Sequence, residues 1–214
     1  MDSVTIRQTQ TQTQVLVNSF VRSVYNWMAI GLALTGFVAY TVANIQTMLN
    51  IIFGNPIVFW GLIIGELVMV FTISARVNKM QASTATALFV LYAALNGATL
   101  SAVFLAYTKS SIASTFFVCA GTFVAASIYG WTTKKDLTSF GSFLFMGLIG
   151  IIIASVVNLF LKSSGMTMII SYIGVLLFTG LTVYDTQRLK NMALTQPAGL
   201  EAGVVRKGAI LGAL

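Results

Sequence analysis

Two acidic side chains lie inside long apolar stretches of the sequence, where a charged group is costly. The chain has five Asp and Glu residues, of which Asp2, Asp136 and Glu201 lie in polar segments. The other two, Glu66 and Asp185, lie within segments apolar enough to enter a bilayer. An ionisable residue in such a segment usually faces a cavity or a partner and marks a functional site. Glu66 and Asp185 are therefore the first candidates for chemistry.

The composition excludes several familiar chemistries. There is no histidine, and Cys119 is the single cysteine. These counts exclude a disulfide within the chain, a zinc site of Cys and His, and a hydrolase that needs a histidine base. Cys119 is expected to be a small buried packing residue. An intramembrane aspartyl protease needs two carboxylates that share a proton, and Glu66 lies too deep in its segment to pair with Asp185. We therefore expect that the protein is not an enzyme and has no cofactor.

The apolar content indicates a membrane protein. Hydrophobic residues make up 57% of the chain and charged residues 8%, against roughly 25% charged residues in soluble domains. A helix needs about 20 apolar residues to cross the bilayer, whereas a barrel strand needs only about 10. Six blocks are long enough for helices: 25–43, 56–75, 84–107, 112–131, 140–161 and 166–188. The sequence predicts an all-α polytopic bundle of six transmembrane helices in a lipid bilayer.

The remaining segments are polar or short. Residues 1–22 are rich in Gln and Thr and are expected to form a flexible cytoplasmic tail before the six-helix bundle at 23–190. Residues 191–207 contain Pro197 and Gly199 and are expected to form a cytoplasmic loop. Residues 208–214 are expected to begin a seventh helix that is incomplete.

The basic residues predict the orientation, because Lys and Arg accumulate in short cytoplasmic loops. Of the 12 basic residues, Lys109 and Lys162 fall on one side of the six predicted helices and the rest on the other. This places the N-terminus in the cytoplasm and accounts for the net charge of +7. A nucleic-acid partner is not expected, since no basic stripe or aromatic platform accompanies the charge.

Arg76 is a candidate partner for Asp185. The predicted helices at 56–75 and 166–188 both run inward, so Arg76 and Asp185 both lie near the cytoplasmic boundary. An ion pair between them would close the inner mouth of a cavity, and protonation of Asp185 would release it. The alternative is a local pair between Asp185 and Arg188, three residues further along the helix, that anchors the helix end.

Several extended motifs resemble one family of membrane proteins. They are Val24-Tyr-Asn-Trp-Met28, Thr132-Thr-Lys-Lys-Asp136-Leu-Thr-Ser-Phe-Gly141 and Gly180-Leu-Thr-Val-Tyr-Asp185-Thr-Gln-Arg-Leu-Lys-Asn191. In order and spacing they resemble the Bax inhibitor-1 family, also called the TMBIM family, and in particular its bacterial YbhL-like branch.

The resemblance implies six helices around a central seventh, and a pH-sensitive calcium leak in the bacterial inner membrane. In that scheme an aspartate on helix six shares a proton with one on helix seven. An arginine after helix two latches the first aspartate, and a glutamate within helix two lines the path. The matching positions here are Asp185, Arg76 and Glu66, while the second aspartate has no match in 208–214.

Calcium binds oxygen ligands, so Asp185 and Glu66 are also candidate metal ligands. Asn96, Asn158, Ser155 and Thr182 are secondary candidates, although hydrogen bonding between helices is the role we favour for them. The alternative function is a regulator that transports nothing, such as a modulator of a membrane-anchored protease or of stress survival. Its partner would contact the N-terminal tail or the loop at 134–136.

Overall fold

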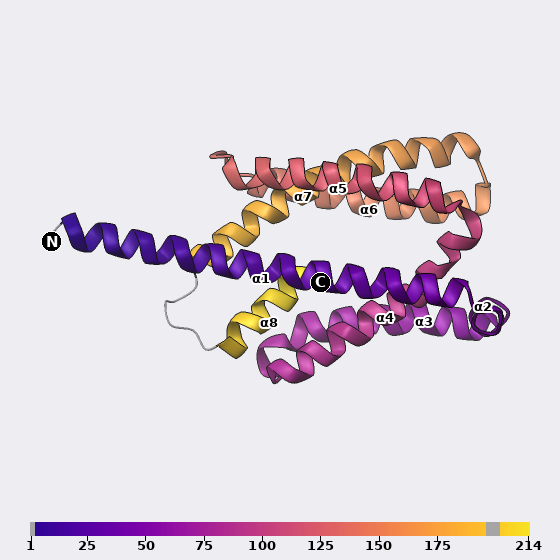
Figure 1. The fold of residues 1–214 in the computed structure, drawn as a ribbon. Coiled ribbons are helices and arrows are strands. Elements are labelled where there is room, and N and C mark those ends of the chain that lie inside the picture. The colour runs from indigo at the N-terminus through magenta and orange to yellow at the C-terminus, as the bar shows by residue number, and fades with distance from the viewer. Residues whose placement is uncertain (1–2, 196–201) are drawn as a thin grey trace. The chain divides into compact units, whose positions relative to one another are not determined.

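The computed structural model describes the backbone of residues 3–195 and 202–214, and the side chains of 18–194 and 202–214. All the regular structure in these residues is helical (Figure 1). The helices are α1 (Ser3–Ala43), α2 (Gln46–Phe53), α3 (Pro56–Arg76), the short 3-10 helix η1 (Val77–Lys79), α4 (Ala82–Ala106), α5 (Lys109–Thr132), α6 (Thr138–Leu161), α7 (Ser164–Thr195) and α8 (Ala202–Ala213).

Six helices of the described chain are long and apolar enough to cross a membrane. They are Asn18–Ala43, Pro56–Lys79, Ala82–Ala106, Lys109–Thr132, Thr138–Leu161 and Ser164–Leu194. Many of their large apolar side chains point away from the protein, and Phe160 and Ile57 are 83% and 82% exposed. Such exposure is unfavourable in water and favourable in lipid. The predicted all-α fold with six membrane helices is confirmed, and the chain is a polytopic helical membrane protein.

The chain divides into two compact units, and each is described by itself. Unit 1 comprises residues 1–114 and 193–214, and unit 2 comprises residues 115–192. Unit 1 contains α1, α2, α3, α4 and α8, and unit 2 contains α6 and most of α5 and α7.

In unit 1, the C-terminal half of α1 packs closely against α4 (Figure 1). A Cβ at Gly97 would lie 2.6 Å from the carbonyl oxygen of Thr35 and 2.7 Å from Cβ of Val38. The hydroxyl of Thr35 donates a hydrogen bond of 2.9 Å to the carbonyl of Ala93. A glycine in α4 therefore lets the two backbones approach, as is common between membrane helices.

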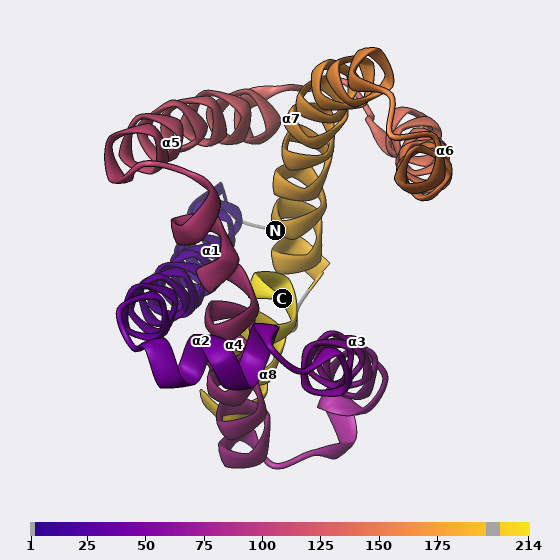
Figure 2. The same cartoon turned by 90° about the vertical axis from the view of Figure 1, so that its right-hand side faces the viewer.

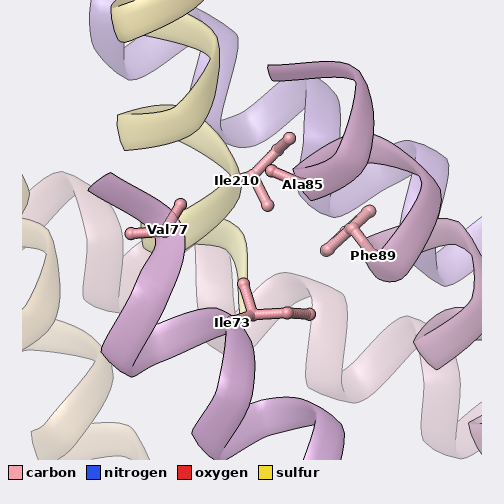
Figure 3. Close-up of a cluster of buried hydrophobic side chains, with 5 residues drawn as sticks. All are labelled: Ile73, Val77, Ala85, Phe89 and Ile210. Atoms are coloured by element: carbon pink, nitrogen blue, oxygen red, sulfur yellow. The ribbon is translucent and has the colours of Figure 1, made fainter. Parts of the chain in front are cut away.

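Helix α8 packs in unit 1 against α1, α4 and η1 (Figures 1 and 2). Ile210 of α8 is fully buried and lies in a cluster of apolar side chains from three other segments (Figure 3). The cluster consists of Ile73, Val77, Ala85, Phe89 and Ile210. Trp27 of α1 covers it, with its ring edge-to-face on Phe89 at a centroid separation of 5.8 Å. The apolar side chains of α8 thus complete the core of unit 1.

In unit 2, α7 lies between α5 and α6 (Figure 2). A Cβ at Gly130 of α5 would lie closer than 3.0 Å to the carbonyl oxygen of Val183. On the α6 side, a Cβ at Gly141 would lie closer than 3.0 Å to the ring of Tyr184. A Cβ at Gly147 of α6 would likewise lie closer than 3.0 Å to the side chain of Leu177 on α7. In the other direction, a Cβ at Gly180 of α7 would lie closer than 3.0 Å to the side chain of Leu144 on α6.

Several expected features differ from the structure. The backbone is helical from Ser3, where a flexible tail was expected over 1–22, because residues 3–22 contain no Pro or Gly to interrupt a helix. Helical backbone also covers residues 191–195 and 202–207 of the expected loop, while 196–201, with Pro197 and Gly199, lie outside the described residues. Cys119 is exposed, so its expected burial was wrong; a thiol is apolar enough to face lipid.

Truncating Ile210 should destabilise unit 1. Ile210→Ala leaves a cavity in the cluster of Figure 3, and buried Ile→Ala changes cost roughly 2–5 kcal/mol. The matched control is Val204→Ala on the same helix, where the side chain is 41% exposed and the cost should stay within about 0.5 kcal/mol. Thermal unfolding in detergent measures both. Equal losses for the two variants would contradict the packing of α8 described above.

Candidate functional site

Asp185 lines an open groove between α6 and α7 within unit 2. The groove has a volume of about 540 Å³. Its lining residues are Gly141, Ser142, Phe145, Leu148, Leu181, Tyr184, Asp185 and Arg188. Gly141 gives room for the Tyr184 ring, and the next residue, Asp185, lines the groove. A carboxylate is thus placed beside a cavity within a membrane-spanning helix, as expected for a functional site.

The residues that follow Asp185 form hydrogen bonds from α7 to α5 and to the α5–α6 loop. Thr186 is buried, and its hydroxyl lies 3.5 Å from that of Ser127 on α5. The side-chain amide of Gln187 donates to the carbonyl of Lys135 at 2.7 Å and accepts from the backbone N–H of Leu137 at 3.0 Å. This side chain therefore binds the α5–α6 loop through two backbone groups.

Lys190 makes a further link one turn later. Its ammonium donates to the carbonyl of Trp131 at 2.9 Å and lies 5.7 Å from the centre of the Trp131 ring. The cation is thus placed over an aromatic face while it satisfies a carbonyl in the last turn of α5. Together, Thr186, Gln187 and Lys190 fix the end of α7 that carries Asp185.

Glu66 lies in unit 1, where α3 faces α4. It is partly buried, and its carboxylate accepts a hydrogen bond of 2.9 Å from the hydroxyl of Thr99. The same hydroxyl lies 3.0 Å from the carbonyl of Asn96. Helix α3 begins with Pro56, and Asn55 caps it by accepting from the N–H of Ile57 at 3.0 Å. Ten residues of α3 separate Glu66 from Arg76 at the C-terminal end of the helix, so the two residues lie about 15 Å apart along its axis.

Arg76 is exposed at the last residue of α3. It belongs to unit 1, whereas Asp185 belongs to unit 2, so the Arg76–Asp185 ion pair stays a prediction. The residues after Arg76 form η1, and Lys207 of α8 donates to the carbonyl of Asn78 there at 3.2 Å. Within unit 2, the local alternative for Asp185 is not a close pair, since no ion pair within 4.0 Å joins the described residues Asp185 and Arg188.

Asp136 lies outside the membrane-spanning helices, two residues before α6 begins at Thr138. Its carboxylate accepts from the backbone N–H of Thr138 at 2.9 Å and from the Thr138 hydroxyl at 2.6 Å. These two hydrogen bonds favour the ionised form and hold the pKa of Asp136 below its ordinary value of 3.8. Asp136 thus has a structural role at the helix start.

The secondary polar candidates make mostly local hydrogen bonds. Asn96, Ser155 and Thr182 each donate to the carbonyl four residues earlier in the same helix. Asn158 instead donates to the hydroxyl of Thr167 on α7 at 2.8 Å and accepts from the N–H of Ser163 at 3.1 Å. Asn158 therefore links α6 to α7 at the opposite end from Asp185.

The two candidate calcium ligands are not brought together within either unit. Glu66 belongs to unit 1 and Asp185 to unit 2. Among the described residues, no group of three His, Cys, Asp or Glu side chains could hold a metal ion. A calcium ion would thus depend on carbonyl, hydroxyl and water oxygens beside any single carboxylate.

Comparison with known proteins identifies the family. Residues 17–214 match the family described as inhibitor of apoptosis-promoting Bax1. The chain is 49% identical over 203 residues to the inner membrane protein YbhL of Escherichia coli strain K12, an alignment that covers 95% of this chain and 86% of that protein. The chain belongs to the Bax inhibitor-1 family.

Relatives occur in distant bacteria. An uncharacterized protein of Borreliella burgdorferi is 48% identical over 185 residues, with 86% of this chain and 80% of that protein covered. An uncharacterized protein of Deinococcus radiodurans is 41% identical over 209 residues, with 98% and 88% covered. The Bax inhibitor-1 match thus extends over all six membrane spans.

Sequence analysis of this Bax inhibitor-1 protein did not single out Thr99, which donates a hydrogen bond to Glu66, or Gln187, which binds the α5–α6 loop close to Asp185. Thr99 was one of several small polar residues in an apolar block, and nothing in its spacing singled it out. Gln187 lies in a motif that supported the family resemblance, but its two bonds to the α5–α6 loop depend on tertiary structure. The sequence offered one signal for Gln187: an uncharged polar side chain two residues after a membrane aspartate.

The stabilising effect of Asp136 should disappear in acid. Because the folded-state pKa is lowered, ionised Asp136 stabilises the fold above the ordinary value of 3.8, and this stability is lost as pH falls through the lower folded-state pKa. The difference in thermal unfolding between the wild type and Asp136→Ala should therefore be present at neutral pH and shrink below pH 3.8. A difference that stays constant in acid would contradict the cap.

Removing the Gln187 amide should loosen the α5–α6 loop. Gln187→Ala deprives the N–H of Leu137, a buried residue, of its acceptor, at a cost of about 1–3 kcal/mol. Hydrogen exchange at Leu137 should accelerate by about tenfold or more. The matched control is Thr182→Val, which removes a bond within α7 itself and should leave the loop unchanged. Unaltered exchange at Leu137 in Gln187→Ala would disprove the role of Gln187.

Proposed function

We propose that this Bax inhibitor-1 protein is a pH-modulated calcium leak channel of a bacterial inner membrane, gated by protonation of Asp185. The observation that supports this most is a carboxylate that lines the groove of about 540 Å³ between two membrane helices. An ionisable residue is kept in such a place at a cost, which a role in ion passage explains. The inner-membrane location follows the name of the E. coli relative.

The proposed gate uses opposite charges. Ionised Asp185 attracts Arg76 and closes the inner mouth of the path, and protonation of Asp185 removes that attraction. The proposal places both residues, and the N-terminus, on the cytoplasmic side, as the distribution of basic residues favours. Tyr184 and Ser142 supply further oxygens beside Asp185 in the groove.

Glu66 is proposed to line the path elsewhere along its length. Its hydrogen bond from Thr99 fixes one carboxylate oxygen and leaves the other available to a passing cation. Calcium is a suitable cargo because it accepts irregular sets of carboxylate, hydroxyl and water oxygens. The proposal includes no catalysis that needs a histidine, since the chain has none.

Calcium entry into dye-loaded proteoliposomes tests the proposal. Wild-type flux should rise as the pH falls and Asp185 is protonated. Asp185→Asn, which resembles the protonated carboxyl, should give a flux that no longer depends on pH and that is close to the acid rate of the wild type. Glu66→Gln should lower the flux at every pH without removing the pH dependence.

Asp136→Asn is the matched control, because it makes the same chemical change at a residue that accepts a hydrogen bond from the first residue of α6 and does not line the groove. Its flux and pH dependence should equal those of the wild type. A wild-type flux no greater than that of empty liposomes would contradict the leak and favour a regulator that transports nothing, such as a modulator of a membrane-anchored protease or of stress survival.

A further inference from the structure

The α6–α7 groove is polar at one end and apolar at the other. Helices α6 and α7 are antiparallel, with Gly141 against Tyr184 and Gly147 against Leu177. Ser142 therefore lies at the level of Asp185 and Arg188, near the start of α6. The lining residues further into the membrane span are Phe145, Leu148 and Leu181. The groove thus changes from charged to apolar along its length, as a phospholipid does.

Basic residues lie on the segments next to the polar end of the groove, and of these residues Arg188 lines the groove itself. Gln187 holds the carbonyl of Lys135, so the α5–α6 loop lies beside the turn of α7 that carries Arg188. Lys134, Lys135 and Arg188 are exposed. Lys190 is placed over Trp131. These four cations face two carboxylates from the same segments, Asp136 and Asp185, and Asp136 is occupied by two bonds from Thr138.

Arg188 is the cation best placed in the groove itself. It lines the cavity, and no ion pair within 4.0 Å joins it to Asp185, both being described residues. A guanidinium binds phosphate through two parallel hydrogen bonds, and its planar fork suits this better than an ammonium. Basic pockets between transmembrane helices are typical binding sites for anionic lipid headgroups.

We propose that this groove binds one anionic phospholipid, with its phosphate on Arg188 and part of an acyl chain along Phe145, Leu148 and Leu181. A soluble phosphate would use only the polar end and leave the apolar surface uncovered. A zwitterionic lipid has the acyl chain but carries its own cation, which the surrounding lysines repel. An anionic phospholipid matches both ends of the groove at once.

The size of the groove agrees with this occupant. Its volume of about 540 Å³ lies within the range of ligand pockets, roughly 300–1,000 Å³. Within unit 2 the groove is partly open. This inference does not depend on calcium transport, because lipid binding is measured without calcium.

Native mass spectrometry of the purified full chain tests the proposal. The protein is titrated with phosphatidylglycerol or with phosphatidylcholine of the same acyl chains, and the occupancy of the first bound lipid is measured. The wild type should bind phosphatidylglycerol more tightly. Arg188→Gln should weaken that binding by about fivefold, the effect of about 1 kcal/mol for one cation at a membrane surface. Phosphatidylcholine binding should be unchanged.

Three further variants separate a built site from general attraction. Arg188→Lys should restore part of the affinity. Leu181→Trp, which fills the apolar end but keeps every charge, should weaken phosphatidylglycerol binding at unchanged thermal stability. Lys162→Gln removes a cation at the other end of α6 and should have no effect. Soluble glycerol phosphate, which lacks acyl chains, should not displace the lipid.

Several results would overturn the proposal. Equal affinity of the wild type for the two lipids would show that the groove does not select anionic headgroups. An equal loss of phosphatidylglycerol affinity in Arg188→Gln and Lys162→Gln would show that the affinity depends only on the net charge of the protein. Displacement by glycerol phosphate would show that the acyl end contributes nothing. Lipid selectivity with no calcium flux would leave this inference standing while the proposed leak fails.

Discussion

The hydrocarbon interior of a bilayer offers no hydrogen-bonding partner, and this constraint determines the rest of the structure. Each spanning segment must satisfy its own backbone and therefore becomes a helix. Helices that are already satisfied associate through close packing. Here glycines permit that packing, with Gly130 against the Val183 carbonyl and Gly141 against the Tyr184 ring. These contacts fix the rotation of α7, and with it the placement of Asp185 at the groove.

The apolar segments of the sequence predicted the membrane helices correctly, whereas the polar segments did not reveal where those helices continue. The six apolar blocks match the six spans because about 20 apolar residues have few alternatives to a membrane helix. The polar stretches at 3–22 and 191–195 are helical although they were expected to be irregular. Outside the apolar region, hydropathy no longer reports on the backbone, and helix propensity without Pro or Gly allows the helix to continue.

The candidate site was predictable in its charges but not in its uncharged surroundings. Glu66 and Asp185 stand out because a carboxylate within an apolar block is rare. Thr99 and Gln187 are ordinary residues whose importance depends on which helix faces which, and at what register. The rotation of a helix whose surroundings are apolar on every side has no strong signature in sequence. The Arg76–Asp185 pair, inferred from depth alone, stays a prediction.

The reciprocal glycine contacts of α6 and α7 have a mechanical consequence. Tyr184 and Leu177 of α7 lie on glycines of α6, while Leu144 of α6 lies on Gly180 of α7. Sliding or turning one helix against the other would drive these side chains into backbone, in an interior that deforms little. The two helices are therefore expected to move as one rigid hairpin. Any rearrangement that changes the surroundings of Asp185 has to take place at the outer faces of that hairpin, not along its seam.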